Sequence, residues 1–294
     1  MSTASADPMQ STRTLRQVIA RHPVTAMLLL MFIIAWAFLV PAALAGVPLI
    51  PFPLLGAIFL GQLGPSVLVT WAGGGWPEVR HLFGRIFRWR VHPAWFLLAI
   101  FGIPIVSLLW TAAVFGGGAV HALFTNPKVF EEYLSALTIL PIVSLWEETA
   151  WMGVVQARLA TYRGPLLAAV ITGPLFGLLH MPLQIGQPIG TFLLTMAALM
   201  VFGIPFRILL GWLYNVTGGS ILIVAIAHTT FDATNNGQLL AGAAPGQFLL
   251  QPGGGAVHLV ILAGAILALI LTRGRLGSPT SEPSPAPVPA HTTP

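Results

Sequence analysis

The sequence predicts an all-α fold, a polytopic integral membrane helical bundle with about eight transmembrane helices. Only 7% of its 294 residues are charged and 56% are hydrophobic, whereas a soluble domain carries about 25% charged residues. So few charges cannot cover a surface that faces water. Apolar runs of about 20 residues, the length that a helix needs to cross a bilayer, recur along the whole chain. We therefore expect the membrane lipid bilayer to be the principal surroundings of this protein.

The apolar runs define the expected helices. Each run is long enough for a span and is bounded by charged, glycine-rich or proline-containing loops. The expected spans are 24–44, 50–72, 94–116, 134–157, 165–181, 189–213, 219–236 and 256–272.

Arginines in the connecting loops predict the orientation. They lie before the first span, between the second and third, between the fourth and fifth, and after the eighth, and the opposite loops hold only Lys128. Cytoplasmic loops are the ones enriched in Lys and Arg. We therefore expect a multi-pass protein of the cell membrane with both termini cytoplasmic. The formal net charge of +5 is explained by this topology, so no nucleic acid partner is expected, and a chain without cysteine has no disulfide framework.

Composition also divides the chain. Residues 1–22 are expected to be a basic cytoplasmic segment, mostly disordered, and 23–133 to hold the first three transmembrane helices. Helices four to seven, at 134–236, are expected to form the functional core. The last transmembrane helix is expected within 237–273, and the Pro- and Ser-rich tail 274–294 is expected to be disordered.

A few ionisable residues fall inside the expected spans, where each costs roughly 3 kcal/mol and is a functional candidate. They are Glu147, Glu148, His180, Arg207, His228 and Asp232. With a rise of 1.5 Å per residue, the two glutamates lie about 15 and 13 Å from the cytoplasmic end of their span, and the two histidines and the aspartate about 14 to 22 Å from that side. Agreement in depth across three helices predicts one intramembrane site. Arg207 lies nearer the cytoplasmic end, where snorkelling to the interface is expected.

Helical geometry assigns roles within this group. Adjacent residues differ by about 100° around a helix, so one of Glu147 and Glu148 is expected to face the site while the other pairs nearby. His228 and Asp232, at i and i+4, share a helix face, so Asp232 can orient the imidazole.

Two chemistries fit such a set. A buried carboxylate with two imidazoles can activate a water molecule for attack on a carbonyl carbon. Alternatively, Glu147, His180 and His228 are a ligand set typical of catalytic zinc. Both lead to hydrolysis of an amide or ester, and the sequence leaves open whether the cofactor is zinc, another divalent metal or none. Proton relays are also built from such residues, so a proton-coupled carrier is the rival.

Three motifs occur in order, each in its own apolar span: EETAWMG at Glu147–Gly153, FGLLH at Phe176–His180 and HTTFD at His228–Asp232. Together they resemble the CAAX prenyl endopeptidase and bacteriocin-processing (CPBP, or ABI) family of intramembrane proteases. The resemblance implies that Glu147 and His180 activate the water, Glu148 supports Glu147, and His228 and Asp232 stabilise the oxyanion or complete the water site. It implies a peptide or a lipid-anchored protein as substrate.

One departure from the family pattern stands out. Met152 occupies the position where the motif has arginine, and methionine cannot pair with a carboxylate. Arg158 lies about 16 Å along the helix from Glu147, too far to substitute, which leaves Arg207 as a stand-in from another helix. The departure motivates an alternative, a catalytically inactive immunity-type or scaffold protein of the same fold.

Overall fold

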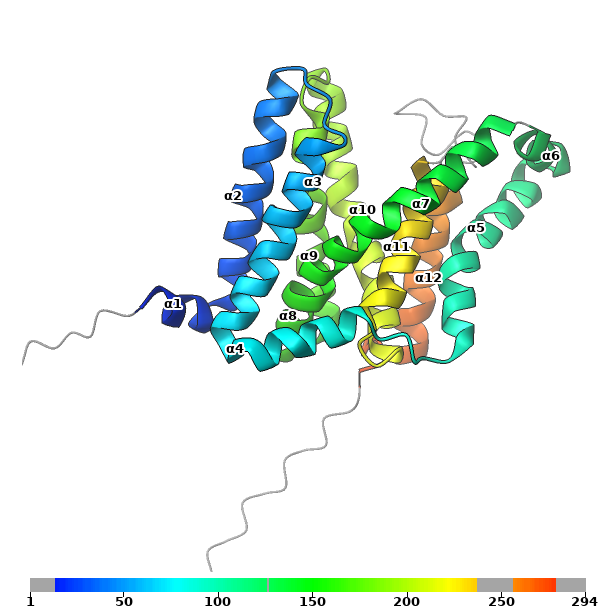
Figure 1. Ribbon diagram of the computed structural model, residues 1–294. Helices are drawn as coiled ribbons and strands as arrows, with labels where there is room; N and C mark the ends of the chain where they lie inside the picture. The colour runs from blue at the N-terminus through cyan, green and yellow to red at the C-terminus, as the bar shows by residue number, and fades with distance from the viewer. Residues whose placement is uncertain (1–13, 126, 237–255, 279–294) are drawn as a thin grey trace, which may run out of the picture.

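The computed structural model describes residues 14–125, 127–236 and 256–278, and this part of the chain contains helices and no strands (Figure 1). The expected disorder of 1–13 and 279–294 lies outside the described residues, as does 237–255. The protein is a helical membrane protein, as the composition predicts. Its two described ends, α1 and the end of α12, lie on the same face of the bundle (Figure 1).

The N-terminal elements run along one side of the bundle. They are α1 (Leu15–Arg21), α2 (Pro23–Leu44), α3 (Phe52–Ile58), the π-helical segment η1 (Phe59–Leu63) and α4 (Gly64–Ile86). The chain runs without a break from α3 through η1 into α4, which kinks at Gly75, where φ is 71°. A positive φ of this kind is accessible to glycine at little steric cost.

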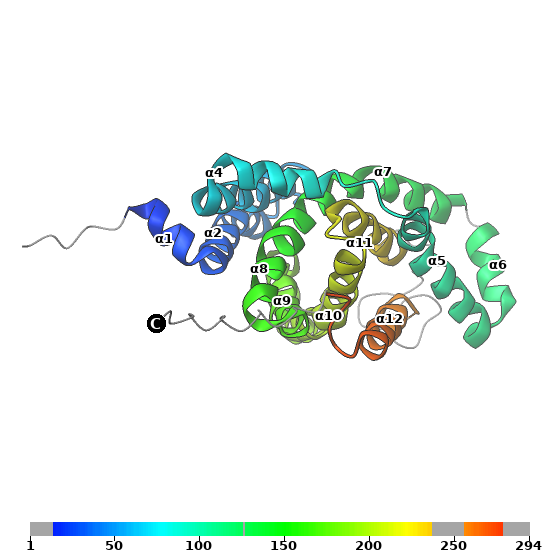
Figure 2. The same ribbon diagram turned by 90° about the horizontal axis from the view of Figure 1, so that it is seen from below.

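The remaining elements complete the bundle. They are α5 (Pro93–Phe115), α6 (Gly117–Thr125), α7 (Pro127–Ala150), the π-helical η2 (Trp151–Gln156), α8 (Ala157–Arg163), α9 (Pro165–Leu179), the 3₁₀ turn η3 (Met181–Gln184), α10 (Ile189–Val216), α11 (Ile221–Asn236) and α12 (Ala256–Thr272). Helices α7 to α11 enclose the centre of the bundle when it is viewed from below (Figure 2).

Every expected span coincides with a helical segment. Four helices of the described chain are long and apolar enough to cross a membrane: Pro23–Leu44, Phe52–Ile86, Pro93–Phe115 and Ile189–Val216. Pro165–Leu179 and Val257–Thr272 are apolar but shorter. A total of eight crossings therefore remains a prediction.

Two segments expected to be disordered are ordered in part. Residues Leu15–Arg21 form α1, because Thr14 and Gln17 make a capping box that satisfies free N–H groups at the helix start. Beyond α12, Leu276 is fully buried, and its carbonyl oxygen accepts a hydrogen bond of 2.9 Å from the Asn215 side chain. The polar composition of both segments concealed these local interactions.

Helices α9 and α10 pack backbone to backbone. A Cβ atom added at Gly173 of α9 would lie 2.6 Å from the carbonyl carbon of Gly203 of α10, closer than any real contact. Small residues allow such approach in membranes, where van der Waals packing drives helix association. The contact places the middle of α9 beside the middle of α10, with His180 at the end of α9 and Arg207 on α10.

We expect Gly173→Leu to force α9 and α10 apart and to lower the free energy of unfolding by about 1–3 kcal/mol or more, as overpacking does. Thermal unfolding of the detergent-solubilised protein measures the effect. Gly190→Leu is the matched control, since a Cβ at Gly190 of α10 meets no atom within 4 Å. Equal unfolding temperatures for the two variants would contradict the close packing.

Candidate active site

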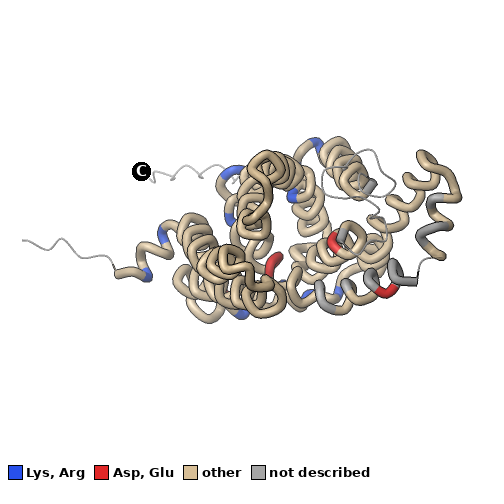
Figure 3. Tube along the Cα trace, turned by 90° about the horizontal axis from the view of Figure 1, so that it is seen from above, with Lys and Arg blue, Asp and Glu red and all other residues tan. Residues whose placement is uncertain are grey.

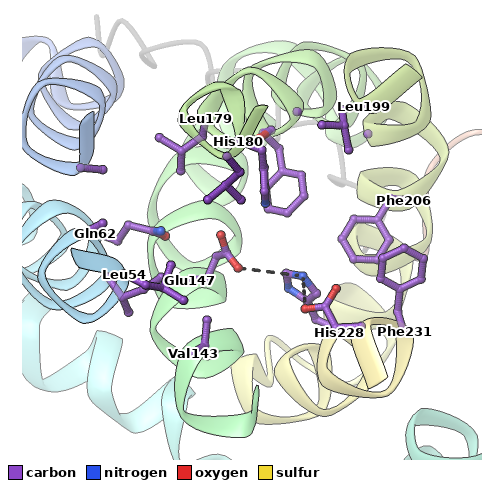
Figure 4. A pocket seen from close by; sticks show the side chains of 18 of the residues that line it. Leu54, Gln62, Val143, Glu147, Leu179, His180, Leu199, Phe206, His228 and Phe231 are labelled. Atoms are coloured by element: carbon purple, nitrogen blue, oxygen red, sulfur yellow. Dashed lines mark hydrogen bonds and ion pairs between the residues drawn. The ribbon is translucent and has the colours of Figure 1, made fainter. Parts of the chain in front are cut away.

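A cavity of about 340 Å³ lies in the centre of the bundle. Four of the five predicted site residues line it: Glu147 from α7, His180 from the end of α9, and His228 and Asp232 from α11 (Figure 4). The predicted convergence of three helices on one place is therefore present. Viewed from above, acidic residues lie both near the centre of the bundle and toward its edge (Figure 3).

Glu147 faces the cavity. Its side chain is largely buried, and its Oε2 atom lies 3.9 Å from Nε2 of His228. That separation is too long for a hydrogen bond. The Glu147 carboxylate is thus close to the His228 imidazole without a hydrogen bond to it, so its oxygens can bind a molecule in the cavity.

Glu148 does not line the cavity and is fully buried. Both of its carboxylate oxygens accept from Nη1 of Arg207, at 2.9 Å each, and Oε1 also lies 2.8 Å from Nδ1 of His228. The two glutamates are therefore arranged as the 100° step between adjacent helical residues predicts, with one facing the site and the other paired nearby.

Arg207 does not snorkel, and that prediction is wrong. Its side chain is fully buried, because two acceptors in the interior bind the guanidinium. Besides Glu148, the Oε1 atom of Gln156 accepts from Arg207 Nε at 2.9 Å, and Gln156 Nε2 donates to the Arg207 carbonyl oxygen at 3.1 Å. A buried charge is tolerated when it is paired and hydrogen-bonded in this way.

Gln156 is the residue that sequence reasoning missed. A signal was available, since it is a polar side chain at the end of an apolar span and lies about two helical turns after Glu148. The structure also places Arg158 away from the site, where it donates to Thr70 at 3.4 Å, in accord with its predicted distance from Glu147.

His228 is oriented by carboxylates on both of its nitrogens. Its Nδ1 donates to Glu148, which directs Nε2 toward Asp232 Oδ2 at 3.5 Å and toward Glu147. Glu148 is itself held by Arg207, so the orientation of this imidazole rests on a chain of charge-assisted contacts from three helices.

His180 lies at the C-terminal end of α9, which stops where Pro182 follows, since proline cannot continue the helical hydrogen bonds. Its Nδ1 donates to the Phe176 carbonyl oxygen at 2.9 Å, which leaves Nε2 as an acceptor. The Phe176 ring packs edge-on against His180 at 4.9 Å and against His228 at 5.7 Å. Phe176 therefore separates and steadies the two imidazoles.

The sequence offered Glu147, His180 and His228 as the ligands of a metal ion, if the protein uses one. Within the described residues, no three His, Asp or Glu side chains are grouped so that they could hold a metal ion. The geometry does not support that set, so no step below passes through a metal.

The fold and the site define a class: a polytopic helical membrane protein with a buried carboxylate–imidazole site at the centre of its bundle. Residues 128–234 match the family model described as Rce1-like, type II CAAX prenyl endopeptidase Rce1-like. The match covers all five predicted site residues and confirms the resemblance drawn from the three motifs. This part of the chain is thus similar to proteins of the CAAX-protease type. A search of curated proteins found no match.

Proposed function

We propose that the protein is an intramembrane endopeptidase of the CAAX-protease type, which hydrolyses a peptide bond with a water molecule activated by Glu147 and His180. One observation carries the proposal. The Glu147 carboxylate faces an internal cavity beside two oriented imidazoles, while the charge of its neighbour Glu148 is balanced by Arg207.

The proposed reaction begins with water held between the Glu147 carboxylate and Nε2 of His180. Glu147 accepts a proton as the water oxygen attacks the substrate carbonyl carbon. The resulting oxyanion lies near His228, whose Nε2–H donates to it when the imidazole is protonated. The proton on Glu147 then passes to the leaving amine as the C–N bond breaks, which restores the carboxylate.

The catalytically inactive alternative rests on Met152. The absence of an arginine at position 152 is a weaker argument for inactivity, because Arg207 of α10 pairs with Glu148. The proton-coupled carrier has no observation in its favour beyond the residue types. We retain cleavage as the function and propose a peptide or a lipid-anchored protein as substrate, at the cell membrane with both termini cytoplasmic.

Mapping of peptide termini tests the function. Wild type and Glu147→Ala are expressed in the native host, and new termini are determined across the membrane proteome. Termini found only with wild type are expected, and they would also reveal the substrate. Glu78→Ala is the control, since Glu78 is exposed on α4. This variant is expected to give the same new termini as wild type. Identical termini in wild type and Glu147→Ala, at equal protein abundance, would overturn the proposal.

A further inference from the structure

Gln62 has a buried polar side chain whose carbonyl oxygen lacks a protein partner within the described residues. It lies on η1, its exposed fraction is 3%, and its Oε1 atom accepts no hydrogen bond from the part of the chain that the structure describes. The side chain lines the cavity and extends toward Glu147 (Figure 4). Burial of an unpaired carbonyl oxygen costs free energy, so this position calls for an explanation.

The main chain around Gln62 is firmly held. The Ser66 hydroxyl donates to the Gln62 carbonyl oxygen at 2.7 Å. Gly61 packs so closely on α2 that an added Cβ would lie 2.8 Å from the Ala35 nitrogen. The side chain is therefore presented from a fixed backbone, while its own acceptor stays unused.

Gln62 also lies on a π-helical segment, a feature that is frequent at functional sites. The other π-helical segment of the described chain, η2, begins three residues after Glu148. One irregular segment thus carries Gln62 itself, and the other follows Glu148 along the chain. Gln62 precedes the family match at 128–234, so the motifs gave no reason to single it out.

The nature of the missing partner follows from the walls of the cavity. An unused acceptor needs a donor, whereas the surrounding walls are largely aliphatic and aromatic, as at Leu54, Val143, Leu199 and Phe231. The matching occupant is apolar and carries N–H groups. A peptide segment with apolar side chains has both properties.

We propose that Gln62 is a substrate-positioning residue whose Oε1 atom accepts a hydrogen bond from a backbone N–H of an apolar peptide segment bound in the cavity. The bond aligns the peptide across from Glu147. The inference deepens the proposed function and gives the N-terminal helices, through η1, a direct part in substrate binding.

The test uses binding without cleavage. Full-length Glu147→Gln protein in lipid nanodiscs is titrated with dansyl-Leu-Leu-Leu-amide and with two depsipeptide analogues, each with one of the two peptide-bond N–H groups replaced by an ester oxygen. Fluorescence anisotropy gives Kd. One analogue is expected to bind about 5- to 10-fold more weakly than the amide peptide, the effect of one hydrogen bond. Because this comparison leaves the protein unchanged, it does not depend on the folding of a further variant.

Gln62→Met is then added to the Glu147→Gln protein, since methionine has a similar length but lacks the acceptor. It is expected to weaken binding of the amide peptide by the same factor. The protein should then bind the amide peptide and that analogue equally. Ser107→Ala is the control, because Ser107 also has a buried hydroxyl that lacks a partner among the described residues, but it does not line the cavity. Absence of saturable binding, equal affinity for the amide and all analogues, or a preference that survives Gln62→Met would each overturn the inference.

The two proposals fail in different ways. Peptide binding that depends on Gln62, together with termini that do not depend on Glu147, would support the binding role and overturn the protease. Termini that depend on Glu147, together with peptide binding indifferent to Gln62, would support the protease and overturn the positioning role.

Discussion

Replacing Arg207 with methionine is expected to lower the free energy of unfolding by about 3–5 kcal/mol, the cost of removing one partner from a buried ion pair. Glu148 would be left as a buried carboxylate without its cation, since Arg207 Nη1 is bonded to both of its oxygens. His228 would also lose its fixed position, because its Nδ1 is held by Glu148. Cleavage should be lost together with stability, as measured by thermal unfolding in detergent and by the appearance of new termini.

Two further variants make this prediction specific. Arg158→Met removes a cation of the neighbouring helix that contacts Thr70 and not the site, so the site should be unaffected. Met152→Arg added to Arg207→Met places a cation four residues after Glu148, within reach on one helix, and should recover part of both losses. Unchanged stability and cleavage in Arg207→Met would contradict the role assigned to the pair.

The second large effect is that substitutions of the two adjacent glutamates, Glu147 and Glu148, are expected to change different properties of the protein. Glu147→Gln is expected to reduce turnover by about 10²–10⁴-fold, the range for removal of a general base, with little change in unfolding temperature. Its carboxylate makes no contact with His228 shorter than 3.9 Å. Glu148→Gln is expected to lower the unfolding temperature, because Arg207 and His228 would lose the charge that binds them.

The comparison needs both readouts on each variant: turnover of a substrate revealed by terminus mapping, and thermal unfolding of the same preparation. Equal losses of stability in the two variants would show that Glu147 has a structural role. Retained turnover in Glu147→Gln would show that Glu147 is not the general base.

Several features followed from the sequence alone. Apolar runs and sparse charge indicated a helical membrane bundle, because lipid-facing helices must be apolar over their whole length. The depth of Glu147, His180, His228 and Asp232 indicated one site, because the fixed rise of a helix converts sequence position into distance. The 100° step between adjacent residues indicated that Glu147 and Glu148 have different partners.

Other features were decided by the tertiary structure. Position along its own span suggested that Arg207 snorkels, but α10 packs so that its guanidinium reaches Glu148 and Gln156 from another helix. Gln62 belongs to a distant segment that joins the cavity only when α3 and η1 pack beside α2 and α7. Periodicity and composition describe each helix by itself, whereas the partner of a buried polar group depends on how helices pack together, and that physical difference separates what the sequence determined from what the fold decided.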